Sequence, residues 1–299
     1  MALWNECLPK DPITIERFWR LFLLDANFRA ETMFVAVAHG QPIGFLQAMV
    51  RRTPIGIFPS NPQHGWITAF CVAPEHRRRG IGRALMEAGM DVLAKSGCKA
   101  VSCNGYAPSY AFPGVDVDYV EGIAFMEAMG FQPSVQAVRM AKDLAGVTTP
   151  DDVSRTKAEL ESQGFSVRVF QVDDTLPLLK FAEEQFPYWH QSLVDGLQQN
   201  SSNVWVASYV GSIVGFAQWE NPQTDPPNGA SGRFGPFGVD PSLRGKGLGG
   251  VIFYTLVEDV IRRGAKHLWF GWAGGRNLSF YERVGCQVTR RYQMFKQEI

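Results

Sequence analysis

The feature that most constrains this chain is a short pattern that occurs twice. In the first half, Arg77-Arg78-Arg79-Gly80-Ile81-Gly82 follows the apolar run Phe70-Cys71-Val72 and a proline-marked turn. In the second half, Arg244-Gly245-Lys246-Gly247-Leu248-Gly249 follows Phe237-Gly238-Val239 and a similar turn. A segment with apolar residues at helical spacing comes next in each copy. Each copy therefore predicts a strand, a glycine loop and a helix.

Both copies read Arg-x-x-Gly-x-Gly, which suits a loop that binds a pyrophosphate. Glycine keeps side chains away from the anion, and the helix that follows directs its free N–H groups and its positive dipole end toward it. Arg77 and Arg244 add positive charge. The predicted contacts are Val72, Arg77, Arg78, Arg79, Gly80, Ile81 and Gly82 in the first copy, and Val239, Arg244, Gly245, Lys246, Gly247, Leu248 and Gly249 in the second.

The second copy also satisfies Gly-x-Gly-x-x-Gly, the fingerprint of dinucleotide-binding folds. Those folds expect an acidic residue about 20 positions further on, to bind a ribose hydroxyl. The segment Ala265 to Phe270 offers none, and the first copy has Arg78 where the first glycine would stand. The two halves therefore share the arginine motif and not the dinucleotide fingerprint.

The spacing of matching residues predicts a duplicated α/β unit. Arg244 follows Arg77 by 167 residues and Gly264 follows Gly97 by the same number, whereas Gly285 follows Gly130 by 155. The first half therefore has 12 additional residues, which we place in the loop 104–119. We expect an N-terminal domain at 1–146, a linking helix within 147–164 and a C-terminal domain at 165–299.

Local patterns predict the elements around the motifs. We expect an abbreviated first strand with a turn over 1–11 and a helix over 14–27. A hairpin is predicted on either side of Gly40 and again on either side of Gly211, and a Pro/Gly-rich loop over 221–232.

Composition excludes several classes of protein. Of 299 residues, 45% are hydrophobic and 19% charged, which is enough apolar surface for packed cores. The net charge is zero and the pI about 7, so we expect neither nucleic acid nor an anionic membrane as a partner. No apolar run approaches the roughly 20 residues that span a bilayer, and the N-terminus does not resemble a signal peptide, so we expect a cytoplasmic protein. The five cysteines and five histidines show no metal-binding spacing, so no metal is expected.

The repeated motif resembles that of the GNAT superfamily of N-acetyltransferases, [Gln/Arg]-x-x-Gly-x-[Gly/Ala]. Over nearly its full length the chain is similar to tandem GNAT proteins. The resemblance implies an α/β fold with a mixed sheet in each of two tandem GNAT acetyltransferase domains. It also implies acetyl-CoA as co-substrate, no metal, and a small-molecule primary amine, of which an amino sugar is one candidate, as acceptor. A monomer or a homodimer is expected.

The resemblance also indicates catalytic residues in the second half. It places the cofactor between Arg233–Val239 and His267–Trp272, with the backbone of Val239 at the acetyl carbonyl. Asn277-Leu278-Ser279-Phe280-Tyr281-Glu282 matches the family pattern Asn-x-x-[Phe/Leu]-Tyr-Glu. Tyr281 is therefore the expected general acid, because a phenol with a pKa near 10 is protonated at neutral pH. Asn277 is an expected cofactor contact. The alternative is that Tyr281 only packs its ring.

The first half departs from this pattern. When Phe125 is aligned with Phe280, Met126 stands at the place of the tyrosine and Gly122 at that of the asparagine. A thioether cannot protonate a thiolate, so we expect this half to bind acetyl-CoA without being the main catalyst, unless Tyr110 or Tyr119 substitutes.

The general base is less determined. Glu220 ends a predicted strand beside the cleft, where the first half has Met49, and it is the expected base. His190 is the rival.

Three functions remain open from the sequence. The first is an acetyl-CoA-dependent N-acetyltransferase, an acyltransferase acting on a small amine by direct attack. The second is a sensor that binds acyl-CoA without turnover. The third is a protein or peptide N-acetyltransferase, for which the loop 104–119 would have to form a groove.

Overall fold

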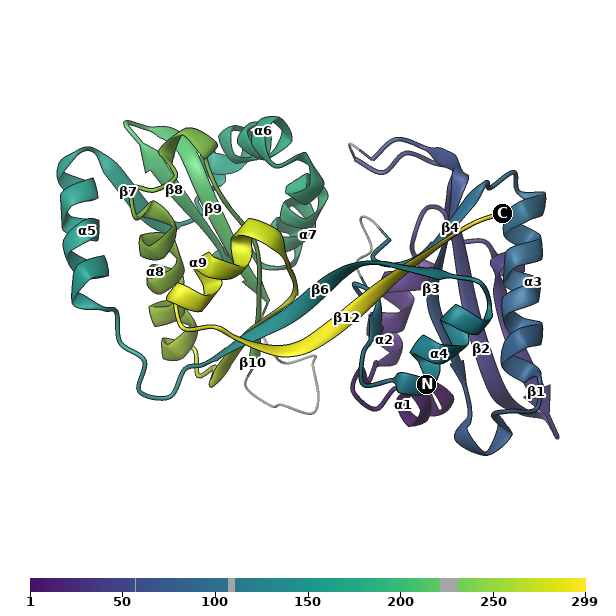
Figure 1. Cartoon of the computed structure of the whole chain (residues 1–299). Helices are drawn as coiled ribbons and strands as arrows, with labels where there is room; N and C mark the ends of the chain where they lie inside the picture. Colours follow the sequence, from purple (N-terminus) through teal and green to yellow (C-terminus); the bar gives the residue numbers. More distant parts are fainter. Residues whose placement is uncertain (57, 107–110, 221–230) are drawn as a thin grey trace. The chain divides into compact units, whose positions relative to one another are not determined.

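The computed structural model describes residues 1–56, 58–106, 111–220 and 231–299. The chain forms two compact units (Figure 1). Unit 1 comprises Met1–Val138 and Arg290–Ile299, and unit 2 comprises Arg139–Thr289. Each unit is a mixed sheet with helices packed on both faces, so the predicted α/β class is confirmed.

In unit 1 the sheet order is β1-β2-β3-β4-β12, followed by the first part of β6. The strand pair β3–β4 is parallel, whereas β1–β2, β2–β3 and β12–β4 are antiparallel. The elements that begin in this unit are α1 (Ala2–Cys7), α2 (Ile15–Phe18), the π-helix η1 (Trp19–Leu23), η2 (Ala30–Thr32), β1 (Met33–Ala38), β2 (Gln41–Arg51), β3 (Asn61–Val72), η3 (Pro74–His76), α3 (Ile81–Lys95), β4 (Ala100–Cys103), β5 (Val115–Asp116), α4 (Val120–Ala128) and β6 (Gln132–Asp143).

The side chains of β2 show how the two faces of this sheet are packed. Leu46, Ala48 and Val50 lie in the cluster beneath α3, whereas Phe45 lies in the cluster beneath α1 and α2. Because successive side chains of a strand point to opposite faces, one apolar strand can serve two cores. This explains why the central strands read as continuous apolar runs.

Unit 2 repeats the arrangement. Its sheet begins with the last part of β6 and continues as β11-β10-β9-β8-β7. The elements that begin in this unit are α5 (Asp151–Ser162), β7 (Phe165–Val169), η4 (Val172–Asp174), α6 (Thr175–Gln185), η5 (Pro187–Trp189), α7 (His190–Asn200), η6 (Ser201–Asn203), β8 (Val204–Tyr209), β9 (Ser212–Glu220), β10 (Ser231–Val239), η8 (Pro241–Leu243), α8 (Leu248–Arg262), β11 (His267–Ala273), η9 (Gly275–Asn277), α9 (Leu278–Arg283) and β12 (Gln287–Glu298).

The last strands of the two sequence halves are exchanged between the units. In unit 1 the N–H of Ile299 donates to the carbonyl of Lys99, and in unit 2 the N–H of Leu144 donates to the carbonyl of Lys266, both at 2.9 Å. Ile299 and Leu144 occupy matching places in the repeat, as do Lys99 and Lys266. Each sheet is therefore completed by the strand of the other half. The expected domain ranges 1–146 and 165–299 therefore differ from the two units, which divide the chain after Val138 and after Thr289.

Two local expectations for the N-terminal part differ from the structure. Residues Ala2–Cys7 form a helix where a strand was predicted, since Trp4 and Cys7 both turn into the core at helical spacing. The helix predicted over 14–27 is shorter, because α2 continues only as the π-turn η1 to Leu23.

The sequence also predicted two hairpins, a linking helix and a Pro/Gly-rich loop. The predicted hairpins are present, with positive φ at Gly40 and Gly211. The predicted linking helix is α5, which packs on α8 within unit 2. Most of the predicted loop 221–232 lies outside the described residues. Within the described part of the chain, no helix combines the length and the apolar character needed to cross a membrane.

Candidate active site

The two arginine-glycine loops have the same backbone conformation. Gly245 and Gly247 have φ of 82° and 82°, and the matching Arg78 and Gly80 have φ of 59° and 83°. Arg78 thus adopts a left-handed conformation that is uncommon for a residue with a Cβ. No side chain caps the helix that follows either loop, so the N–H groups of its first turn have no side-chain acceptor. Both loops are exposed, and both can receive an anion through the main chain.

The apolar members of the predicted loop sets can act only through their backbone. Val72 and Leu248 are buried, and Ile81 and Val239 are half-buried. The second motif glycine serves packing. A Cβ on Gly82 would lie 3.4 Å from the ring of Phe125 on α4, and one on Gly249 would lie 3.3 Å from the ring of Phe280 on α9. The glycine therefore allows the last helix of each unit to approach the motif helix.

The arginines of the two loops differ in their partners. In unit 1, Arg77 donates from Nε to the carbonyl of Val72 at 3.1 Å and from Nη1 to Glu121 at 3.0 Å. In unit 2, Arg244 is exposed and forms no ion pair with any described residue. Arg244 is thus available to a diphosphate, whereas Arg77 already faces a carboxylate.

The motif strand and its parallel neighbour part in both units. In unit 2, β10 pairs with β11 only from Ser231 to Arg233, and the rest of β10 up to Val239 does not pair with β11. In unit 1, β3 pairs with β4 only from His64 to Trp66. The edge of β10 beyond Arg233 therefore has main-chain groups that β11 does not bind. The register of β10 against β9 also shifts between Phe234 and Phe237, around a cis Gly235–Pro236 bond.

Tyr281 packs across the two parted strands of unit 2. Its ring centroid lies 4.2 Å from that of Phe270 on β11 and 6.3 Å from that of Phe234 on β10. Burial, with a smaller contribution from Cys286, raises the pKa of the phenol well above its ordinary value near 10. The phenol of Tyr281 is therefore neutral at physiological pH. Asn277 is exposed and precedes α9 as its N-cap residue.

The structure supports the alignment that places Met126 at the position of Tyr281. Phe125 stacks on Phe70 with centroids 5.0 Å apart, just as Phe280 stacks on Phe237 at 5.5 Å. Met126 is buried, with 3% of its surface exposed. A thioether in an apolar core supplies no proton, so unit 1 has no proton donor at the place that Tyr281 occupies in unit 2.

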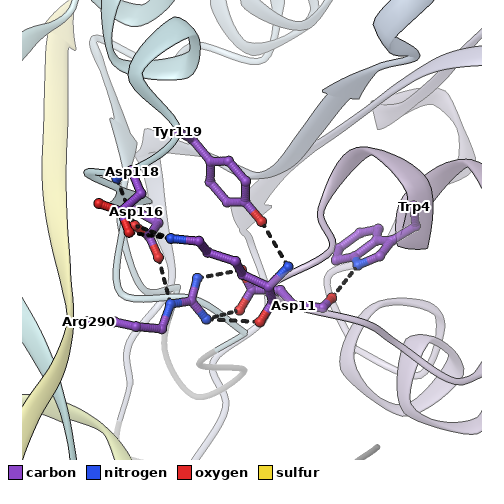
Figure 2. A network of polar contacts seen from close by, with 7 residues as sticks. Trp4, Asp11, Asp116, Asp118, Tyr119 and Arg290 are labelled. Carbon is purple, nitrogen blue, oxygen red and sulfur yellow. Dashed lines mark hydrogen bonds and ion pairs between the residues drawn. The ribbon is translucent and has the colours of Figure 1, made fainter. Parts of the chain in front are cut away.

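Of the two tyrosines that could substitute at this place, the structure describes only Tyr119. Tyr110 lies outside the described residues. The hydroxyl of Tyr119 accepts a hydrogen bond from the N–H of Lys10 at 3.2 Å (Figure 2). Tyr119 therefore belongs to the polar network that ties the N-terminal segment to the loop of Asp116 and Asp118.

In unit 1, the sheet face beneath α1 and α2 is filled by aromatic side chains. Trp4 from α1 contacts Phe22, Phe45 and Phe112, with ring centroids 5.8 to 6.1 Å apart. The same cluster covers Ala69 and Cys71 of the motif strand. Sequence reasoning missed this arrangement. The signal was the spacing of Leu3, Trp4 and Cys7, which is that of a short helix.

The acid–base candidates of unit 2 occupy different environments. Glu220 accepts from Nη1 of Arg233 at 2.7 Å across the β9–β10 pair, and both side chains are about two-fifths exposed. His190 begins α7, and its Nδ1 is buried without a partner in the described structure. Sequence reasoning missed the partner Arg233, because cross-strand register is not readable from one chain.

Two close contacts in unit 2 were also missed. A Cβ on Gly238 would lie 2.9 Å from the Phe186 ring, and one on Gly196 would lie 2.2 Å from the Gln218 amide. These glycines let Phe186 and α7 pack directly on the sheet, on the face that carries Glu220. Among the described residues, no group of three or more His, Cys, Asp or Glu side chains is arranged to hold a metal ion.

Comparison with known proteins identifies a family whose model matches both halves of the chain. The model of the Acetyltransferase (GNAT) family matches residues 1–131 and 169–286. No curated protein matches the chain.

Three of the solved structures that match share the fold over nearly the whole chain. One is a GCN5-related glucosamine N-acetyltransferase region in a fungal multi-domain GH3 β-N-acetylglucosaminidase, with 20% identity and a TM-score of 0.81 over 99% of this chain. The match covers 36% of that fungal chain, so this chain spans little more than a third of its length. A GCN5-related N-acetyltransferase from Sphaerobacter thermophilus has 18% identity and a TM-score of 0.71, covering 99% of this chain and 90% of that one. A tandem GNAT protein from the clavulanic acid biosynthesis pathway has 16% identity and a TM-score of 0.62, covering 95% and 94%.

Proposed function

Because this chain belongs to the acetyltransferase (GNAT) family, we propose that it is an acetyl-CoA-dependent N-acetyltransferase acting on the primary amine of a small molecule. The transfer takes place in unit 2, by direct attack of the amine in a ternary complex. The observation that carries the proposal is Tyr281, a neutral phenol packed across the parted strands β10 and β11. An amino sugar is the first acceptor to test, since one structural relative is named a glucosamine N-acetyltransferase.

The residues of the second loop fit a diphosphate. The start of α8 has no side-chain cap, and Gly245 and Gly247 hold the left-handed backbone that turns main-chain N–H groups toward one side. Arg244 and Lys246 are exposed beside it and add two positive charges. We propose that Val239 and Arg244 to Gly249, with Asn277 near the start of α9, hold acetyl-CoA.

Bound acetyl-CoA would supply the acetyl group, with a thiolate as leaving group. Oη of Tyr281 gives its proton to that leaving group, because its raised pKa keeps the phenol protonated. Glu220 is the proposed base, which removes a proton from the acceptor amine. Its hydrogen bond with Arg233 fixes the position of the carboxylate.

We propose that unit 1 binds acetyl-CoA without transferring the acetyl group. Its loop has the same backbone conformation, which supports binding through Val72 and Arg77 to Gly82. Met126 replaces the acid, and Trp4 and Phe112 fill the sheet face that in unit 2 carries Glu220. In this proposal, binding of acyl-CoA without turnover, the second function considered from the sequence, is a property of unit 1 only.

Replacement of Tyr281 tests the proposal. Tyr281→Phe removes the proton donor and keeps the ring packing, so kcat should fall about 100-fold or more with little change in the KM for acetyl-CoA, as expected for lost general acid catalysis. Thiol release from acetyl-CoA, measured with glucosamine and a panel of other amines, gives both constants. Tyr119→Phe in unit 1 is the matched control and should keep the wild-type rate.

Two outcomes would contradict the proposal. A wild-type rate in Tyr281→Phe, with activity lost when Gly80 and Gly82 are replaced, would move catalysis to unit 1. Thiol release that no amine accelerates, in a protein that binds acetyl-CoA, would favour the sensor.

A further inference from the structure

The C-terminal end of α9, the helix that carries Tyr281, is held by a lysine from outside the helix. Nζ of Lys142, on β6, donates to the carbonyl of Val284 at 2.8 Å. The hydroxyl of Tyr254 on α8 donates to the same carbonyl at 3.4 Å. The carbonyls in the last turn of a helix have no amide partner within it, and a cation there also interacts favourably with the helix dipole.

The surroundings are shaped to admit the ammonium group. Gly285 has φ of 80°, and a Cβ at this position would lie 2.5 Å from Nζ of Lys142. The ammonium also lies 5.8 Å from the centroid of the Tyr254 ring, within the range of a cation–π contact. The ammonium group of Lys142 thus contacts a carbonyl and an aromatic ring, and the lack of a side chain at Gly285 leaves space for it.

The anchor is linked to Tyr281 through a short path. The N–H of Cys286 donates to the carbonyl of Tyr281 at 2.9 Å, and the N–H of Val284 donates to that of Phe280 at 3.2 Å. Because α9 comprises only Leu278–Arg283, it has little hydrogen bonding of its own to resist displacement. A shift of Val284 would therefore move the ring of Tyr281.

The same place in unit 1 is occupied by a different residue. Gln297 follows Lys142 by 155 residues, as Gly285 follows Gly130, and Nε2 of Gln297 lies 3.1 Å from the place where a Cβ of Gly130 would stand. Its Oε1 is buried without a partner in the described structure. The strand exchange therefore places a last-strand side chain beside the last helix in both units. The lysine stands beside the helix with the tyrosine, and the glutamine beside the helix with Met126.

We infer that Lys142 is a positioning residue for acetyl transfer, which holds α9 so that Oη of Tyr281 stays where the leaving thiolate forms. The inference rests on the proposed function. It makes catalysis in unit 2 depend on a strand that the sequence repeat assigns to the first half.

The test uses the full chain with Lys142→Met, which keeps the apolar stem and removes the charge and the hydrogen bond. Thiol release from acetyl-CoA with glucosamine should show kcat lowered about tenfold with KM for acetyl-CoA unchanged, because a small displacement of a catalytic group costs rate more than binding. Hydrogen exchange of the amides of 284–286, followed by mass spectrometry, should become about tenfold faster. Lys142→Arg should restore both values to near wild type.

Two further variants keep the test decisive. Lys142→Gln copies the residue that unit 1 tolerates, so it should fold even if Lys142→Met does not, and it too should lower kcat at least about threefold. Gln297→Met in unit 1 is the matched control and should leave kcat unchanged.

A wild-type kcat in both Lys142→Met and Lys142→Gln would overturn the inference, whatever happens to the exchange rates. The failure of the proposed function is recognised separately. If Tyr281→Phe keeps its rate, Tyr281 is not the acid. The hydrogen-exchange comparison then still decides whether Lys142 holds α9.

Discussion

At the scale of single residues, the proposed chemistry depends on the half-buried phenol of Tyr281, whose neutral form is favoured further by desolvation. Phe270 and Phe234 exclude water from one side of Tyr281, and burial penalises the phenolate. The same exclusion of water would penalise a thiolate that forms beside the phenol. Proton transfer from the phenol would therefore neutralise the thiolate as it forms, although the phenol is a weak acid.

The raised pKa predicts how the rate depends on pH. A phenol with a pKa above 10 is fully protonated at neutral pH and loses its proton only as the pH rises through the raised value. We expect kcat with glucosamine to stay constant or to rise up to about pH 10, since the acceptor amine also becomes deprotonated over this range. The measurement is kcat against pH for the wild type and for Tyr281→Phe. A descending limb below about pH 9 that disappears in Tyr281→Phe would show that the pKa is not raised.

At the scale of elements, the junction between strand and helix explains why the motif is glycine-rich. Gly247 and Gly80 have nearly equal positive φ, but their surroundings differ. A Cβ on Gly247 would lie 2.6 Å from Cγ2 of Thr156 on α5, whereas a Cβ on Gly80 would have no neighbour within 4 Å. In unit 2, Gly247 is thus required both by its positive φ and by the close approach of Thr156. In unit 1, Gly80 is required by its positive φ alone.

Alanine at these two glycines should therefore have unequal effects. Each change places a Cβ in a left-handed conformation, which costs about 1–2 kcal/mol of stability. Gly247→Ala should cost more, because Thr156 must also move, and it should raise the KM for acetyl-CoA. Gly80→Ala should leave kcat and KM within about twofold of wild type if unit 1 does not transfer the acetyl group. Urea unfolding and steady-state kinetics give these values.

The double variant Gly247→Ala/Thr156→Ala removes the crowding methyl group and should recover the additional loss of stability. Equal losses in the two single variants would contradict the packing argument.

At the scale of the whole molecule, the exchanged strands make each unit depend on both halves of the sequence. In unit 1, the guanidinium of Arg290 on β12 binds Asp11 with distances of 2.6 and 2.7 Å and Asp116 at 2.6 Å (Figure 2). The side chains of Arg290 and Asp116 are only 11% and 2% exposed. This network joins the N-terminal segment, the inserted loop and the C-terminal strand, which lie far apart in the sequence.

Loss of Arg290 should therefore destabilise unit 1 strongly. Arg290→Met leaves Asp11 without its ion-pair partner and Asp116 with Lys10 alone, at 3.9 Å, and breaking a buried ion pair in this way costs about 3–5 kcal/mol. Arg291→Met, at the exposed neighbouring position, is the control and should change stability by less than about 0.5 kcal/mol. Urea unfolding of both variants measures the difference, and a loss below about 1 kcal/mol in Arg290→Met would show that the network is not needed.

The strand-to-helix loops and the aromatic partners of the last helices could be predicted from the sequence because they depend on local backbone conformation and on spacing along one element. Glycine at 247, a proline turn before it and apolar residues at helical spacing after it specify their structure within about 20 residues. The repeat then aligned Phe125 with Phe280 and placed Met126 at the position of Tyr281. The short helix Ala2–Cys7 was missed because six residues show too little of their period to distinguish a helix from a strand.

What the sequence by itself determined is thus the repeated unit, its loops and the position of Tyr281 on the last helix. Only the tertiary structure decided that each unit takes its final strand from the other half, that Arg233 pairs with Glu220, and that Lys142 anchors α9. The physical reason is the duplication itself. Two strands with nearly the same pattern fit the same edge of either sheet, so local preference does not choose between them, and only packing of the complete chain does.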